Sequence, residues 1–123
     1  MSTGAASEDE IGEALETAKK ESKSEILLFH CISSYSADLL DSNLNSILYL
    51  KKKYKVKVVL SDHTIGSLDG TIAACLGAIA IEKHFTIDRK IKGPDSRFST
   101  QPKEFNNLVN ELDTVIESLG EKN

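Results

Sequence analysis

The sequence predicts an α/β fold whose parallel strands form part of a (β/α)8 barrel. Helical and strand-like segments alternate along the chain, an order that requires parallel strands joined by right-handed crossovers. Polar residues follow each strand-like run, and α/β folds bind ligands at the carboxyl ends of their strands. The chain has 123 residues, whereas a complete barrel usually needs about 250. We therefore expect one incomplete domain over residues 1–123.

The first half of the chain is predicted to form a helix, a strand and a second helix. Ser7 and Glu10 make a capping box that begins the first helix, which continues to Lys19-Lys20. The apolar run 26–32 is too short for a helix and shows no alternation, so a strand buried on both faces fits it. Apolar residues at helical spacing then predict a helix from Leu44 to about Tyr54.

The second half is predicted to contain two strands and two helices. The strands are Val56–Leu60 and Ala78–Glu82, and the helix 68–76 between them closes on Gly77, which suits a left-handed cap. Three strands are few for an independent parallel sheet with open edges, yet a small self-contained α/β sandwich remains the alternative. The last helix follows a Gly-Pro turn and carries the longest apolar stripe, made of Phe105, Leu108, Val109, Leu112, Val115, Ile116 and Leu119.

Composition excludes several classes of protein. The chain is 40% apolar and 28% charged, as expected for a soluble globular domain. Its net charge of −4 does not indicate the basic surface that nucleic-acid binding requires. We interpret the basic run Lys51–Lys53 as a solvated helix end. The sequence has no apolar run that could span a membrane and no signal-peptide pattern. Cys31 and Cys75 lack CxxC spacing and are predicted to be buried free thiols in a reducing cytosol, so we expect a cytoplasmic protein.

Two histidines are the candidate metal ligands. His63 and His84 each follow a short apolar run, so neighbouring strands would deliver them to one edge of the sheet. Neutral imidazoles with an open coordination position suit Mn²⁺, Zn²⁺ or Fe²⁺, and oxygen atoms of a substrate would favour Mn²⁺ or Mg²⁺. A metal held there could polarise a carbonyl oxygen. The alternative is that each histidine is a hydrogen-bonded structural residue.

Other polar residues also follow the predicted strands. Asp62 and Glu82 are candidates to orient the imidazoles or to act in acid–base catalysis. Asp95 is either a site residue or an ordinary turn residue after Gly-Pro, and His30 is predicted to be a satisfied core histidine. Ser33, Ser34 and Tyr35 follow the first predicted strand, and Ser61 follows the second.

Four blocks of the sequence resemble the sialic acid synthase (N-acetylneuraminate synthase) family. They are LFHCISSY at 28–35, SDHT at 61–64, EKHFT at 82–86 and GPD at 93–95, and their order and gaps also match. The opening Ser2-Thr3-Gly4 resembles the family's loop after barrel strand five. The resemblance covers nearly the whole chain. It implies the C-terminal half of the catalytic barrel, about strands 5/6 to 8.

The resemblance also implies a reaction. Members of that family condense phosphoenolpyruvate with an N-acetylated amino sugar such as N-acetylmannosamine, release phosphate and form a nine-carbon 2-keto acid. It implies that His63 and His84 hold a divalent metal, Mn²⁺ or Mg²⁺, which polarises the sugar aldehyde. It implies a catalytic group of His63, His84 and Asp95, with Asp95 and Tyr35 facing the sugar and Ser2, Ser33 and Ser61 near phosphoenolpyruvate.

The chain departs from the family pattern in three respects. Ser36 stands where the family usually has proline, and Ser96 where histidine is common. Strands one to four are absent, with the lysines expected to clamp phosphoenolpyruvate and a glutamate implicated in catalysis. The antifreeze-like domain, which in the dimeric family reaches a partner's active site, is absent too. We therefore expect no turnover by this chain alone. A non-catalytic half-barrel that associates with another chain, and a legionaminic or pseudaminic acid synthase, remain alternatives.

Overall fold

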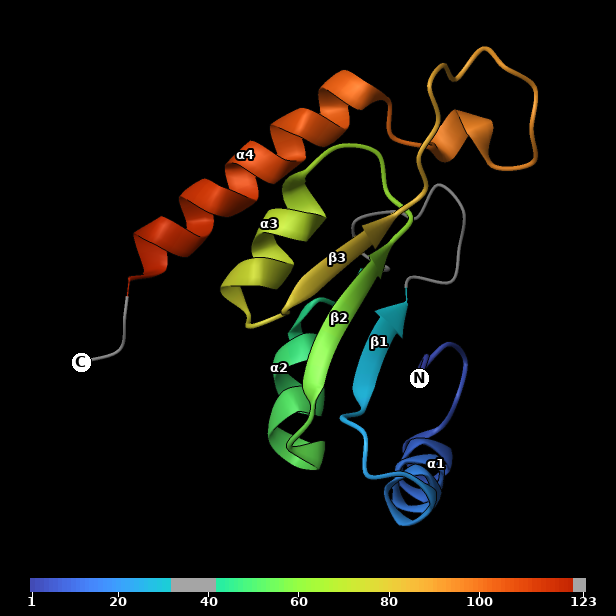
Figure 1. Ribbon diagram of the computed structural model, residues 1–123, viewed down its shortest axis with the longest axis vertical. Helices are drawn as coiled ribbons and strands as arrows, with labels where there is room; N and C mark the ends of the chain where they lie inside the picture. The colour runs from blue at the N-terminus through green and yellow to red at the C-terminus, as the bar shows by residue number, and fades with distance from the viewer. Residues whose placement is uncertain (32–41, 121–123) are drawn as a thin grey trace.

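Strands and helices alternate along the chain in the computed structural model, which describes residues 1–31 and 42–120 (Figure 1). This confirms the predicted α/β alternation. In chain order the elements are α1 (Glu8–Glu21), β1 (Leu27–Cys31), α2 (Asn45–Tyr54), β2 (Lys57–Asp62), α3 (Leu68–Cys75), β3 (Ala80–Lys83), the 3-10 helix η2 (Ser96–Phe98) and α4 (Pro102–Leu119).

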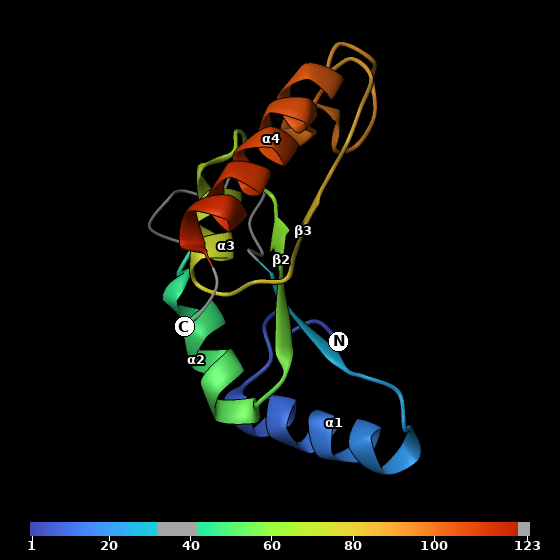
Figure 2. The ribbon, with the colours of Figure 1, turned by 60° about the vertical axis from the view of Figure 1, so that its left-hand side comes forward.

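The strands form a parallel sheet in the order β1-β2-β3. The segment before α1 extends this sheet, because Ser2 forms a parallel bridge with Phe29 and the Thr3 amide donates to the Phe29 carbonyl at 2.9 Å. Residues 1–3 therefore take the place expected for the end of a preceding strand. Figure 2 shows α2, α3 and α4 along one face of the sheet, an arrangement like one side of a barrel wall.

The hydrophobic core lies between the sheet and the helices. β2 is the central strand and is buried at every position after Lys57. The prediction that the run 26–32 forms a strand buried on both faces was wrong for β1, where Leu28 is buried and the other four residues are half-buried. β3 instead alternates exposed and half-buried residues. Successive side chains point to opposite faces of the sheet, and Ile81 packs against the core whereas Ala80 and Glu82 lie on the exposed face. The buried core residues are Ile11, Leu15, Leu28, Ile47, Leu50, Val58, Leu60 and Ala73.

Local signals in the sequence set several helix ends. The Ser7–Glu10 capping box is present at the start of α1. α3 ends in a Schellman motif: Gly77 has φ +98°, its amide donates to Ala74, and the Ala78 amide donates to Ala73. The third strand begins at Ala80 rather than at the predicted Ala78, because the Ala78 amide is used in this cap. The second strand continues two residues beyond Leu60, to Asp62.

Two predictions of burial were wrong. Cys75 is exposed, because α3 buries the face of Asp69, Gly70 and Ala73, and a residue two positions after Ala73 lies on the opposite side of the helix. Cys31 is half-buried, and both thiols are free as predicted.

The apolar stripe of α4 is largely uncovered. Leu108 is the buried residue of α4, whereas Ile116 is 65% exposed. Within residues 1–31 and 42–120, no helix combines the length and the apolar character needed to cross a bilayer.

Candidate functional site

His63 and His84 meet at the carboxyl ends of β2 and β3. The register pairs Ser61 with Glu82 and Asp62 with Lys83, so the residues that follow, the two histidines, come to lie side by side. Their ring centroids are 5.1 Å apart and the rings are steeply inclined to each other, at 67°. Both rings belong to a small pocket of about 160 Å³, which is lined by Ser61, His63, Glu82, Lys83 and His84.

Strand alternation places Ser61 and Glu82 on the same face as the histidines. The Ser61 hydroxyl donates to Oε1 of Glu82 at 2.8 Å and lies 3.3 Å from Nε2 of His63. Ser61 therefore bridges the Glu82 carboxylate and the His63 ring. Glu82 is thereby linked to the His63 ring through Ser61, which is the geometry of a group that orients an imidazole.

Asp62 has a different role from the predicted one. Its Oδ2 accepts a hydrogen bond from Nζ of Lys83 at 2.9 Å, and both side chains are at most 2% exposed. Its Oδ1 accepts from the amide and the hydroxyl of Thr64. Both oxygens are therefore engaged on the face of the sheet opposite the histidines. The prediction that Asp62 orients an imidazole or acts in acid–base catalysis was wrong for this physical reason.

Lys83 holds the ends of β2 and β3 together. Besides Asp62, its ammonium donates to the carbonyls of Thr64 and Gly66, at 2.9 and 2.8 Å. The loop that begins with His63 is thus tied to the strand that ends before His84. Sequence reasoning missed Lys83, although the alternation within Ser-Asp-His and Glu-Lys-His already places Asp62 and Lys83 on one common face.

The backbone of His84 is held from the other side. Its carbonyl accepts a hydrogen bond from the Thr100 amide at 2.8 Å, and the Thr86 amide donates to the Thr100 carbonyl at 3.0 Å. Phe85 and Thr100 consequently form a parallel bridge. The chain just before α4 therefore helps to fix the position of His84.

A row of polar side chains continues across the sheet from the pocket. Cys31 is in register with Ser61, as Ser61 is with Glu82, so all three lie on one face of the sheet. Oγ of Ser2 lies 3.0 Å from Sγ of Cys31. Ser2, predicted to lie near phosphoenolpyruvate, is thus at the end of this row. Cys31 was not predicted as a site residue, because only the strand register reveals its neighbours.

The remaining predicted residues lie away from the pocket or outside the described part of the chain. Asp95 precedes η2, is half-buried, and accepts through its backbone carbonyl from the Ser99 hydroxyl at 2.8 Å. It does not line the histidine pocket. His30 is half-buried with Nε2 3.0 Å from the Ser42 carbonyl, as expected for a satisfied histidine near the core. Ser33, Ser34, Tyr35 and Ser36 lie outside the described residues.

The histidine pair has a donor set that fits a divalent cation. Two imidazoles reach one pocket from adjacent strands, and the Glu82 carboxylate borders the same space. In the described part of the chain, no three His, Cys, Asp or Glu side chains are grouped closely enough to hold a metal by themselves. An ion bound by this pair would therefore keep positions open for oxygen atoms of water or substrate, as catalytic metal sites do.

Known proteins with similar sequences include synthases named for legionaminic and pseudaminic acids. A model of the NeuB family matches residues 1–123. The N,N'-diacetyllegionaminic acid synthase of Legionella pneumophila is 41% identical over 129 residues, 99% of this chain and 36% of that protein. The pseudaminic acid synthase of Campylobacter jejuni is 39% identical over 121 residues, 98% of this chain and 35% of that protein. The chain therefore spans about a third of the length of these relatives.

A solved structure shows the same fold. The sialic acid synthetase of Leptospira borgpetersenii, crystallised with citrate, superposes with a TM-score of 0.93 at 41% identity. The match covers 99% of this chain and 42% of that one. The predicted partial barrel is confirmed, since the structural neighbours are barrel synthases that this chain matches in part. The chain belongs to the NeuB family.

Proposed function

We propose that this chain forms the metal-binding part of a barrel that condenses phosphoenolpyruvate with an N-acetylated amino sugar to a nonulosonic acid. The observation that carries the proposal is the pair His63–His84, which shares one pocket with Ser61 and Glu82 at the carboxyl ends of adjacent strands. Relatives named for pseudaminic and diacetyllegionaminic acids support this class of product. Phosphoenolpyruvate and the metal are inferred from the resemblance of the SDHT and EKHFT blocks.

The reaction joins two carbon atoms. The methylene carbon of phosphoenolpyruvate forms a bond to the aldehyde carbon of the open-chain sugar, water adds to the carbon that bears the phosphate, and phosphate leaves to give a 2-keto acid. A divalent cation, when bound, would stabilise the negative charge that develops on the aldehyde oxygen.

The residues of this chain position the reactants. His63 and His84 would hold the cation, and Glu82 acting through Ser61 would keep the His63 ring oriented. Ser2 lies in the polar row beside Cys31, where a hydroxyl could donate to an anionic substrate. Ser33 and Ser61 would contact phosphoenolpyruvate, and Tyr35 and Asp95 would contact the sugar.

Isothermal titration of Mn²⁺ tests the metal site without requiring turnover. We expect saturable binding to the wild-type chain and a loss of about tenfold or more in affinity in a His63→Ala/His84→Ala variant, because both nitrogen ligands are removed. His30→Gln is the matched control. It removes the third histidine, which lies near Ser42 rather than in the pocket. Equal Mn²⁺ affinity in the wild type and the double variant would contradict the proposal.

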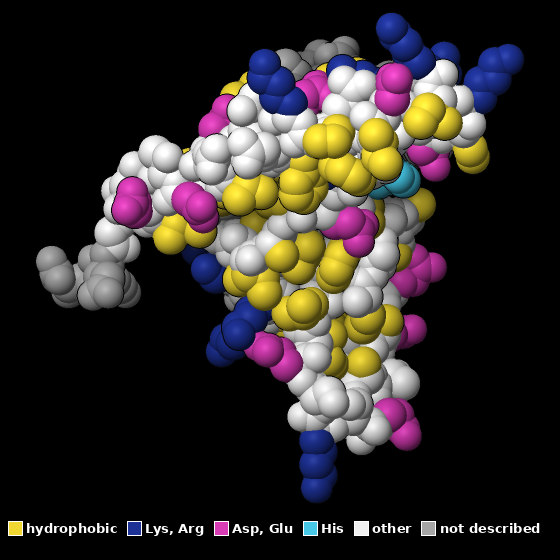
Figure 3. Space-filling view, turned by 45° about the horizontal axis from the view of Figure 1, so that its top comes forward, with side chains coloured by type: hydrophobic (Ala, Val, Ile, Leu, Met, Phe, Trp, Pro, Cys, Tyr) yellow, Lys and Arg dark blue, Asp and Glu magenta, His cyan; other side chains and the backbone are white. Residues whose placement is uncertain are grey.

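A second candidate function is association with another polypeptide. Hydrophobic side chains gather on the face that carries β3 and α4 (Figure 3). The exposed hydrophobic residues of these segments include Ile79 before β3, Phe85 after it, and Val109 on α4, which are 52, 54 and 41% exposed. Exposed apolar surface of this kind marks an interface. A non-catalytic half-barrel would use this surface and the unpaired edge of β3.

A further inference from the structure

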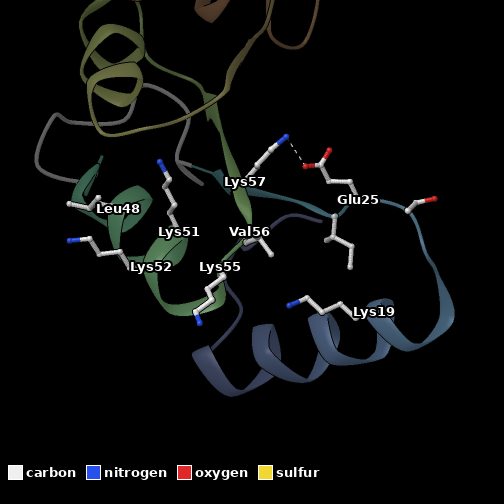
Figure 4. A pocket seen from close by; sticks show the side chains of 10 residues that line it. Lys19, Glu25, Leu48, Lys51, Lys52, Lys55, Val56 and Lys57 are labelled. Atoms are coloured by element: carbon white, nitrogen blue, oxygen red, sulfur yellow. Dashed lines mark ion pairs between the residues drawn. The ribbon is translucent and has the colours of Figure 1, made fainter. Parts of the chain in front are cut away.

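The two ends of the sheet differ in how their charged side chains are arranged. A hollow of about 700 Å³ with five lysines in its lining lies beside the starts of β1 and β2. Figure 4 shows the ammonium groups of Lys51, Lys52 and Lys55 directed away from one another. These lysines are exposed, and the exposure of Lys51–Lys53 agrees with the predicted solvated helix end. Charged side chains therefore diverge at this end, whereas those that follow β3 converge.

The loop that follows β3 connects two residues that the proposed function places in one site. It runs from Phe85 to Gln101 and includes Asp95 and the 3-10 helix η2 (Figure 1). His84, a candidate metal ligand, immediately precedes it. The contacts that close the base of this loop therefore bear on both His84 and Asp95.

Thr100 pairs with the first part of the loop through its backbone. Its amide donates to the His84 carbonyl at 2.8 Å, and its carbonyl accepts from the Thr86 amide at 3.0 Å. Thr100 is 6% exposed and its neighbour Ser99 is 5% exposed, so water competes little for these hydrogen bonds. The position of the His84 backbone therefore depends on where the segment 99–101 is held.

Arg89 holds that segment through three contacts. Its backbone amide donates to Oε1 of Gln101 at 3.0 Å. Its Nη1 donates to the Ser99 carbonyl at 3.3 Å and also pairs with the Glu104 carboxylate in the first turn of α4. A guanidinium presents several donors in a fixed planar arrangement, so one arginine can bind two acceptors at once. The partners of Arg89 thus lie on both sides of Thr100.

Arg89 is also linked to Asp95. The Ser99 hydroxyl donates to the Asp95 backbone carbonyl at 2.8 Å, while the Ser99 carbonyl accepts from Arg89. Ser99 therefore joins Arg89 to the residue that is predicted to face the sugar. Contacts lead from Arg89 to His84 through Thr100, and from Arg89 to Asp95 through Ser99.

We propose that Arg89, paired with Glu104, is a positioning residue that fixes the segment 99–101 and thereby holds the His84 backbone and Asp95 in a set arrangement. The His84 imidazole is then already placed beside His63 when a divalent cation arrives, and less conformational freedom is lost on binding. A cation in this pocket rests on the proposed function. The hold of Arg89 on the two segments can be measured in the metal-free chain.

Amide hydrogen exchange of the metal-free chain, read by NMR, measures this hold. Arg89→Gln should speed exchange of the Thr100 amide by about tenfold, because charge-assisted hydrogen bonds at the base of the loop are lost. Amides of β1 should keep their rates. Arg97→Gln is the matched control: it removes the same charge from the same loop, where Arg97 lies over the Phe98 ring, and should leave the Thr100 rate unchanged.

Two exchange results would overturn the proposal. One is an equal Thr100 rate in the wild type and Arg89→Gln. The other is an equal acceleration of Thr100 and of the β1 amides, which would show a general loss of stability. Glu104→Gln removes the same ion pair from the other side and should also speed Thr100 exchange, so the test does not depend on the folding of Arg89→Gln alone.

Isothermal titration with Mn²⁺ measures the consequence for the histidine pocket. Arg89→Gln should bind Mn²⁺ about threefold to tenfold more weakly than the wild type, because the position of one ligand is less fixed. Arg89→Lys keeps the charge toward Glu104 and should recover part of the affinity, and Arg97→Gln should bind as the wild type does. Wild-type affinity in Arg89→Gln would refute its positioning role. A wild-type chain that binds no Mn²⁺ would instead contradict the proposed function, and Thr100 exchange would still decide whether Arg89 holds the loop.

Discussion

At the scale of single residues, the buried pair Asp62–Lys83 determines how the two histidine-bearing segments meet. Its atoms lie 2.9 Å apart with both side chains almost fully buried, and Lys83 also binds the Thr64 and Gly66 carbonyls. A buried ion pair contributes little net stability compared with an apolar pair, but removal of one partner leaves an uncompensated buried charge. Lys83 is therefore a positioning residue for His63.

Lys83→Met should destabilise the chain by about 3–5 kcal/mol, because the Asp62 carboxylate would remain buried without its cation. Urea unfolding followed by circular dichroism measures the loss. Asp62→Asn/Lys83→Met removes both charges and leaves an amide oxygen for Thr64, so it should be less destabilised than the single variant. A single variant as stable as the wild type would show that the pair does not hold the strands together.

At the scale of elements, Glu104 connects the loop after β3 to the start of α4. Its carboxylate accepts from the Gln101 amide at 3.0 Å and pairs with Arg89. The Arg89 guanidinium, with the Gln101 amide as a second cause, holds the pKa of Glu104 below its ordinary value of 4.5. The carboxylate is about one-third exposed, so solvent screens this contribution.

The lowered pKa of Glu104 predicts a dependence of stability on pH. Because the folded state favours the ionised carboxylate, the stabilisation is fully present above pH 4.5 and is lost as the pH falls through the lower pKa of the folded chain. Glu104→Gln should therefore be less stable than the wild type at pH 7, and the difference should shrink below pH 4.5. Glu111→Gln, on an exposed part of α4, is the control. A difference independent of pH would exclude this linkage.

At the scale of the whole molecule, the sheet is open where the family barrel continues. β3 pairs with β2 alone in the described part of the chain, and the adjoining face is apolar (Figure 3). An unpaired strand edge beside apolar surface favours association with another strand. The same surface would serve a barrel completed by further strands or a second polypeptide.

We expect this 123-residue chain to self-associate in solution at micromolar concentration. Gel filtration with light scattering measures the mass. Val109→Lys places a charge in the apolar face of α4 and should shift the chain toward a monomer, whereas Asn106→Lys on the same helix replaces an exposed polar residue and should not. A wild-type chain that is monomeric would argue against this interface and against the association function.

Local patterns in the sequence were sufficient to predict the order of elements, the α1 capping box, the Gly77 cap and the presence of both histidines at strand ends. These features depend on residues close together in the chain, through the periods of helix and strand and the chemistry of turns. The tertiary structure decided the rest. The pairs Ser61–Glu82 and Asp62–Lys83 are 21 residues apart, and strand register determines them. The exposure of Cys75 and of the α4 stripe depends on which elements cover each face, which no local pattern encodes.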